Sequence, residues 1–138
     1  MSNKRILIVD DDSDGLQSMH LRLKANHYDT SFAADAISCM AEARKNPPDL
    51  VILDLGLPAG DGFVVMERFK AVPSLAGIPV VVVSGHDLHP NQERAIQAGA
   101  KAFLQKPVNS AELLAVIRKA LGEPPQRAKP VVYDLGEP

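Results

Sequence analysis

The sequence has few of the residues that mark disulfide-stabilised, nucleic-acid-binding or membrane-spanning proteins. One cysteine, Cys39, is present among 138 residues, so no internal disulfide can form, and aromatic residues make up only 4%. The formal net charge is -2, without the basic excess that binding to phosphate backbones requires. No apolar run approaches the length of a transmembrane helix, and no signal-peptide pattern opens the chain. We expect one cytoplasmic domain in which Cys39 is a small packing residue.

Short apolar runs rich in β-branched residues are the clearest feature that is present. Three of them, at 6–9, 50–53 and 79–83, do not alternate with polar residues. That pattern is typical of strands covered on both faces in a parallel sheet. The shorter run 102–104 predicts a further strand, and the more polar segment 28–33 predicts a strand at the edge of the sheet.

Helical patterns separate these runs. The last of them has the clearest ends, because Asn109 can cap its start and Gly122 can end it. Five alternations of strand and helix predict a doubly wound α/β domain over residues 1–122, followed by a proline-rich tail or linker at 123–138. The earlier helices are predicted to bury three apolar faces: Leu16, Met19, His20 and Leu23; Ile37, Met40, Ala41 and Arg44; and Phe63, Met66 and Phe69.

Polar side chains gather at the ends of the predicted strands. Asp10 and Asp11 follow the first strand, Asp54 the third and Ser84 the fourth, and Lys106 lies just past the fifth. In an open parallel sheet these positions share the carboxyl edge, where ligands bind beside the topological switch point. Each residue taken singly has an ordinary structural explanation, such as a helix cap or a surface lysine. Their convergence on one edge predicts a functional site.

The residue types at this edge indicate phosphoryl chemistry with a divalent cation. Carboxylates brought close together repel one another unless a cation lies among them. Oxygen ligands without Cys or His favour Mg²⁺, or Mn²⁺, over Zn²⁺, and Mg²⁺ commonly binds one or two carboxylates together with phosphate oxygens. Asp54 is placed to act as a nucleophile toward phosphorus, while Lys106 and Ser84 can neutralise or bond the phosphoryl oxygens.

Four motifs, ILIVDDD, DLVILDLGLPAGDG, PVVVVSG and AGAKAFLQKP, occur in this order between residues 4 and 121. In this the chain resembles the CheY-like receiver domains of two-component response regulators. The resemblance implies a flavodoxin-like fold, in which five parallel strands in the order 2-1-3-4-5 are flanked by five helices. It also implies a phosphorylatable regulatory domain, which catalyses only its own phosphotransfer and dephosphorylation.

The resemblance further assigns a role to each residue of the site. Asp54 is implied to be the phosphoacceptor, assisted by Lys106 and by Ser84, a switch residue together with Phe103. The bond between Lys106 and Pro107 is implied to be cis, which only proline makes inexpensive. The implied ligands of Mg²⁺, or Mn²⁺, are Asp10, Asp11, Asp54 and the backbone carbonyl of Gly56.

The same resemblance implies the partners. The phosphodonor is expected to be a sensor histidine kinase or a phosphotransfer protein, and no nucleic acid or membrane is expected to bind. The output face is formed by the fourth helix, fifth strand and fifth helix, at about residues 91–121. It is expected to control a partner protein or an output domain, or to form a phosphorylation-dependent homodimer. Whether the domain acts alone or begins a longer regulator is left open by the sequence.

Three features depart from the commonest pattern of the family. Phe103 stands where a tyrosine is frequent, so a hydroxyl group that partners read in other members is missing. Gly85 replaces a more usual alanine, which predicts space beside the phosphoryl site and easy reaction with small phosphodonors. Gly56 and His86 occupy positions that tend to tune hydrolysis in this family.

Other functions of the same architecture fit the sequence less well. Phosphatases with an aspartyl nucleophile usually carry it after the first strand, with a second Asp two residues on, whereas Asp54 follows the third strand and has Gly56 there. A flavin-binding domain needs a first loop that attracts phosphate, and the Asp10–Asp12 loop would repel it. A histidine phosphotransfer protein is a helical bundle, which does not accommodate these strands.

Overall fold

The computed structural model describes residues 3–58, 61–85 and 88–124, with the backbone alone described at 88–91. The strands are β1 (Arg5–Val9), β2 (Asp29–Ala33), β3 (Leu50–Asp54), β4 (Val80–Ser84) and β5 (Ala102–Gln105). The helices are α1 (Ser13–Ala25), α2 (Ala36–Lys45), α3 (Asp61–Ala71), α4 (Leu88–Gln97) and α5 (Ser110–Leu121). His86 and the tail from residue 125 onward lie outside the described residues.

The strands form one parallel sheet in the order β2-β1-β3-β4-β5. This confirms the predicted order and the edge position of the polar strand β2. Every residue of β3 and of β4 is buried, which explains why these segments carry uninterrupted apolar runs. No helix in the described part of the chain has both the length and the apolar character needed to cross a membrane.

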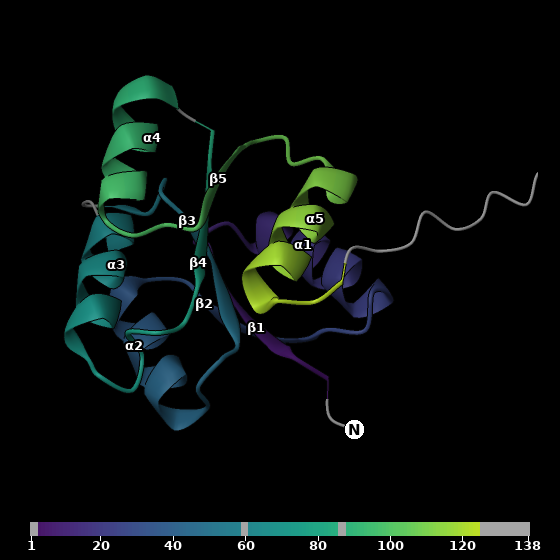
Figure 1. Ribbon diagram of the computed structural model, residues 1–138, viewed down its shortest axis with the longest axis horizontal. Helices are drawn as coiled ribbons and strands as arrows, with labels where there is room; N and C mark the ends of the chain where they lie inside the picture. Colours follow the sequence, from purple (N-terminus) through teal and green to yellow (C-terminus); the bar gives the residue numbers. More distant parts are fainter. Residues whose placement is uncertain (1–2, 59–60, 86–87, 125–138) are drawn as a thin grey trace, which may run out of the picture.

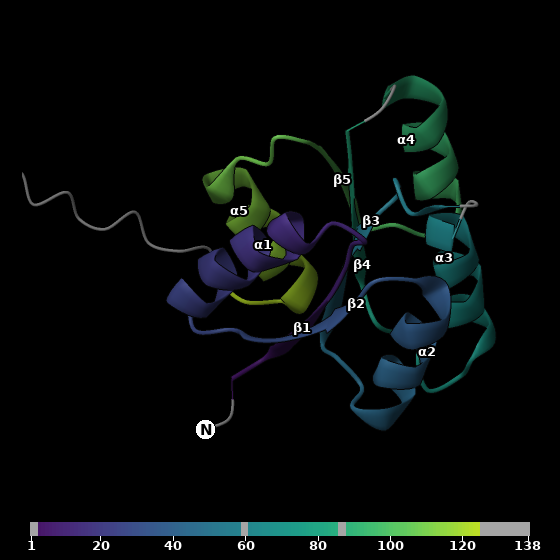
Figure 2. The same cartoon turned by 180° about the vertical axis from the view of Figure 1, so that it is seen from behind.

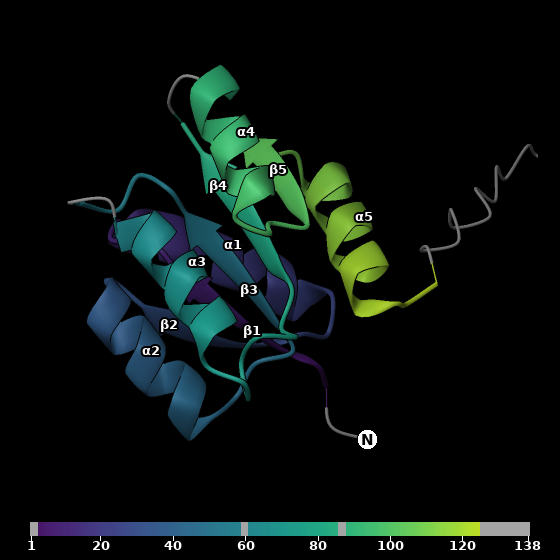
Figure 3. The same cartoon turned by 60° about the vertical axis from the view of Figure 1, so that its left-hand side comes forward.

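The helices cover the two faces of the sheet. Figures 1 and 2 show α1 and α5 on one face and α2, α3 and α4 on the other. Successive strand residues point to opposite faces, so Leu7 and Val9 belong to an apolar cluster beneath α2 and α3, whereas Ile6 and Ile8 belong to a second cluster beneath α1 and α5. Figure 3 shows α2 and α3 in front of the sheet, with α4, β5 and α5 side by side along one border.

Side-chain caps begin α1, α2 and α5, the cap of α2 being Asp35, whose carboxylate accepts a hydrogen bond from the N–H of Ser38. The carboxylate of Asp12 accepts a hydrogen bond from the backbone N–H of Asp14 at the start of α1. Asn109 accepts one from the N–H of Glu112, and Gly122 ends α5 with a φ of 70°. The predicted ends of the last helix are therefore confirmed.

The predicted buried face of α2 is wrong by a rotation about the helix axis. Ile37 is 79% exposed, and Ala41 and Arg44 are exposed as well, so only Met40 of that face is buried. The helix instead buries three small residues beside Met40, because they let its backbone approach the sheet and α3 closely. These small residues are Ala36, Cys39 and Ala43, and the burial of Cys39 confirms its packing role.

Candidate functional site

Three polar side chains are buried where strands end at the carboxyl edge of the sheet. Asp10 follows β1 and is 6% exposed, Asp54 is the last residue of β3 and is 5% exposed, and Ser84 is the last residue of β4 and is 1% exposed. Buried carboxylates need partners, because removing a charge from water is costly. The burial of these polar side chains therefore indicates a functional site at this edge of the sheet.

The carboxylates of this edge form one cluster. Single oxygens of Asp10, Asp11 and Asp54 all lie within 4.8 Å of one another, and Asp11 alone of the three is exposed. The backbone fixes the two buried members: Oδ1 of Asp10 accepts a hydrogen bond from the N–H of Asp12 at 2.9 Å, and Oδ1 of Asp54 accepts one from the N–H of Gly56 at 2.8 Å. Oδ2 of each of these two carboxylates lies near Nζ of Lys106.

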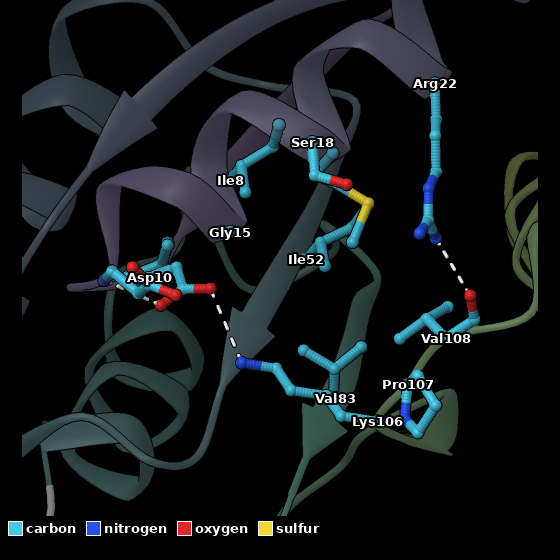
Figure 4. Close-up of a pocket in the computed structure, with 13 residues that line it drawn as sticks. Ile8, Asp10, Gly15, Ser18, Arg22, Ile52, Val83, Lys106, Pro107 and Val108 are labelled. Atoms are coloured by element: carbon cyan, nitrogen blue, oxygen red, sulfur yellow. Dashed lines mark hydrogen bonds and ion pairs between the residues drawn. The ribbon is translucent and has the colours of Figure 1, made fainter.

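Lys106 is the cationic partner of both buried carboxylates. Its Nζ lies 3.0 Å from Oδ2 of Asp54 and 3.5 Å from Oδ2 of Asp10, the latter contact being drawn in Figure 4. The backbone N–H of Lys106 donates to the carbonyl of Ser84 at 2.9 Å, which ties the loop after β5 to the end of β4. The peptide bond between Lys106 and Pro107 is cis. Lys106 thus pairs with two of the three carboxylates of the cluster.

Burial and the neighbouring charges shift the pKa values of Asp10 and Lys106. Burial is the largest cause that raises the pKa of Asp10, and the neighbouring Asp54 raises it further, while the N–H of Asp12 and the charge of Lys106 lower it in part. For Lys106, burial alone lowers the pKa, but the hydrogen bond and charge of Asp54, together with Asp10, outweigh it and raise the pKa overall. The cluster is therefore short of positive charge.

The cluster fits a hydrated divalent cation. All three donors are hard carboxylate oxygens, which suit Mg²⁺ or Mn²⁺. The two buried members are held by the backbone, and the exposed Asp11 lies on the solvent side, where a cation could keep water ligands. A double positive charge would also offset the excess of carboxylates over ammonium.

A model of the response regulator receiver domain matches residues 6–118. The chain belongs to the response regulator receiver family. It is 34% identical over 114 residues to the response regulator PleD of Caulobacter vibrioides, covering 83% of this chain and 25% of PleD. It is 28% identical to the polar-differentiation response regulator DivK of Brucella anthropi, covering 87% of this chain and 98% of DivK.

Solved structures agree with this membership. A CheY-like receiver domain protein from Methanospirillum hungatei is 34% identical, with a TM-score of 0.79 over 88% of this chain and 95% of that one. The chain is thus a receiver domain of the kind found in two-component signalling. It spans only 25% of the length of PleD and 51% of the transcriptional regulatory protein PrrA of Mycobacterium tuberculosis, to which it is 32% identical over 88% of its own length.

The remaining residues singled out in this receiver domain lie around the cluster. Phe103, on β5 opposite Val82 of β4, is half-buried and packs against the apolar cluster that contains Leu7 and Val9 beneath α2 and α3. A Cβ built on Gly85 would lie 3.9 Å from the Cβ and Cδ of Lys106, an ordinary contact distance. The glycine therefore leaves room for one methyl group beside the lysine, in line with the space predicted there.

The structure adds one residue that the motifs do not contain. Gly15, in the first turn of α1, lies directly against Asp10 (Figure 4). The available signal was an isolated glycine within a helical pattern, which commonly has a packing or functional reason.

A cavity of about 200 Å³ adjoins the same edge between α1 and the loop after β5. Asp10, Gly15 and Lys106 line it at one end. At the other end, Arg22 donates a hydrogen bond to the carbonyl of Val108 at 2.9 Å (Figure 4). This bond joins α1 to the loop that carries Lys106.

Proposed function

We propose that this receiver domain is a cytoplasmic phosphorylation switch that takes a phosphoryl group on Asp54 from a phosphohistidine of a sensor kinase or phosphotransfer protein. The observation that carries the proposal is the buried carboxylate of Asp54 at the end of β3, held by the N–H of Gly56 and paired with Lys106 beside the carboxylate of Asp10. A buried, oriented carboxylate among groups of both signs is suited to act as a nucleophile.

Mg²⁺ would be held by the side chains of Asp10, Asp11 and Asp54 and by the carbonyl of Gly56, and when bound it neutralises phosphoryl oxygens. An oxygen of Asp54 forms the new bond to phosphorus as the bond to the donor nitrogen breaks, and the imidazole leaves with that electron pair. Lys106 moves from its carboxylate partners to a phosphoryl oxygen, and the hydroxyl of Ser84 donates to another. The product is an aspartyl phosphate.

The signal would leave through the face formed by α4, β5 and α5. New contacts of the phosphoryl group with Ser84 and Lys106 bias this face between two packings, with Phe103 following the loop at the end of β4. Residues 1–122 form the receiver domain in this proposal, and residues 123–138 form a tail or linker. The face controls a partner protein or an output domain, or pairs with a second phosphorylated copy.

Phosphorylation can be tested with acetyl phosphate and MgCl₂, followed by intact mass spectrometry. The wild type should gain the mass of one phosphoryl group, and neither Asp54→Ala nor the wild type in EDTA should gain it. Asp29→Asn is a matched control, because Asp29 is an exposed carboxylate on β2 outside the cluster, and this variant should react like the wild type. Equal modification of Asp54→Ala and wild type would contradict the assignment of Asp54.

A further inference from the structure

Asp10 occupies space that any other residue at position 15 would fill. A Cβ built on Gly15 would lie 2.7 Å from Oδ2 of Asp10 and 3.5 Å from its Cγ. Real Cβ atoms essentially never approach another heavy atom within 3.0 Å, and nine in ten contacts are longer than 3.4 Å. The carboxylate of Asp10 therefore has its present position only because residue 15 has no side chain.

Nothing in the backbone of α1 calls for a glycine at this position. The described glycines with positive φ are Gly99 and Gly122, so Gly15 has a backbone conformation that alanine also adopts. Glycine is a poor helix former, because it loses more backbone freedom than alanine when the helix forms. We therefore relate Gly15 to the space that its missing side chain leaves for the carboxylate of Asp10.

Asp10 cannot give way to a side chain at no cost. Its Oδ1 is bonded to the N–H of Asp12, and the crowded oxygen Oδ2 lies 3.5 Å from Nζ of Lys106. Relieving the contact from 2.7 Å to between 3.0 and 3.4 Å requires a displacement of about 0.3 to 0.7 Å, by subtraction of these distances. Mg²⁺ demands near-ideal octahedral geometry with oxygens at about 2.0–2.1 Å, whereas Ca²⁺ accepts variable geometry at about 2.3–2.6 Å.

We propose that Gly15 is a positioning residue, which sets the carboxylate of Asp10 for Mg²⁺ and thereby favours Mg²⁺ over the larger Ca²⁺. This inference rests on the proposed function, since it concerns the cation of the same site. Gly15 acts through Asp10, because the other side chain near its missing Cβ, Asp12, lies at an ordinary contact distance of 3.5 Å. A side chain at position 15 would displace Oδ2 of Asp10 by about 0.3 to 0.7 Å. That is more than the narrow spread of Mg²⁺–oxygen distances, about 2.0–2.1 Å, allows, whereas the wider spread for Ca²⁺, about 2.3–2.6 Å, absorbs the lower end of the shift.

The experiment compares Gly15→Ala with wild type by titrating each with MgCl₂ and with CaCl₂, following backbone amide shifts by NMR. We expect Gly15→Ala to lose about 10-fold or more in Mg²⁺ affinity, the size typical of changes next to metal ligands, and distinctly less in Ca²⁺ affinity. Ser18→Ala is the matched control: it also adds helix propensity to α1, but Figure 4 shows its side chain away from Asp10, and it should bind both cations like wild type.

Unchanged Mg²⁺ affinity in Gly15→Ala, or equal losses for both cations, would overturn the inference while leaving the proposed function intact. A wild type that shows no saturable Mg²⁺ binding would instead count against the proposed function itself, and the inference would fail with it.

Thermal unfolding in EDTA tests the steric part independently of any cation. Gly15→Ala should raise the melting temperature when Asp10 is replaced by alanine, because only the gain in helix propensity then remains. In the wild-type background it should give a smaller rise or a fall. The same rise in both backgrounds would show that Asp10 does not occupy the space, and the inference would be wrong.

Discussion

Replacing Asp10 by asparagine should stabilise the cation-free protein. The asparagine carbonyl can still accept the hydrogen bond from the N–H of Asp12, which Oδ1 of Asp10 accepts at 2.9 Å. The change removes a buried negative charge that faces Asp54 and Asp11 across distances of no more than 4.8 Å. It also removes the attraction to Lys106 at 3.5 Å. The outcome depends on which of these effects is larger.

The two charge effects nearly cancel. With an effective dielectric constant of about 20, the repulsion from Asp54, which lies within 4.8 Å, is at least about 3.5 kcal/mol, and the attraction to Lys106 at 3.5 Å is about 5 kcal/mol. The attraction is further reduced, because the side chain of Lys106 is 35% exposed and screened by water. The cost of burying the Asp10 carboxylate then determines the sign of the effect, and we expect the free energy of unfolding of Asp10→Asn to exceed that of the wild type by about 1–2 kcal/mol.

The raised pKa of Asp10 gives the pH dependence of this gain. Because burial raises the pKa above the unfolded value, the ionised group opposes folding at neutral pH, and the wild type recovers stability as the pH falls and Asp10 takes up a proton. The advantage of Asp10→Asn should therefore be largest near pH 7 and shrink as the medium is acidified.

Urea unfolding in EDTA, followed by far-ultraviolet circular dichroism, measures the difference. In MgCl₂ the wild type should gain about 2.7 kcal/mol at a concentration 100 times its Kd, and Asp10→Asn should gain less, so the two stabilities converge or cross. If Asp10→Asn is less stable than wild type in EDTA at pH 7, the assignment of an unfavourable buried charge is refuted.

Three further outcomes follow from contacts elsewhere in the fold. Burial and the 2.7 Å hydrogen bond to Glu123 raise the pKa of Tyr28 to about 12. Tyr28→Phe should therefore lower the free energy of unfolding by about 1–2 kcal/mol below pH 10, as measured in urea. A difference that persists unchanged up to pH 12 would contradict this. Burial raises the pKa of Cys39 to about 12, which lowers its thiolate fraction at pH 8 roughly 1,000-fold, so Ellman's reagent should react with it rapidly only after unfolding. Asn109→Ala should cost about 1 kcal/mol in the same urea assay through the lost cap of α5, and an unchanged midpoint would show that the cap contributes nothing.

The sheet and the polar cluster could be predicted from the sequence because both depend on local patterns combined with topology. The runs that became β3 and β4 are apolar throughout, and a strand buried on both faces leaves such a pattern. Once the strands are parallel, Asp10, Asp54 and Ser84 must emerge at one edge. Their proximity then follows from the order and direction of the strands, and it can be predicted without knowing how the side chains pack.

The rotation of α2 and the role of Gly15 could not be predicted in the same way. A hydrophobic pattern weights residues by their apolar character, so it favoured Ile37 over the small residues that bring α2 close to its neighbours. The effect of Gly15 depends on an atom that it lacks and on the position of Asp10, five residues away along the chain. Both features require coordinates, because they concern the shape of the space between elements.

The sheet separates two apolar layers, and this has a mechanical consequence for the border at β5. Ala95 of α4 packs in one layer and Leu113 and Ile117 of α5 pack in the other, while α4, β5 and α5 lie together on that border (Figure 3). Elsewhere, the strands of the sheet lie between the two layers. A protein that bound α4, β5 and α5 would therefore contact helices from both apolar layers, so its affinity would depend on the packing of both layers.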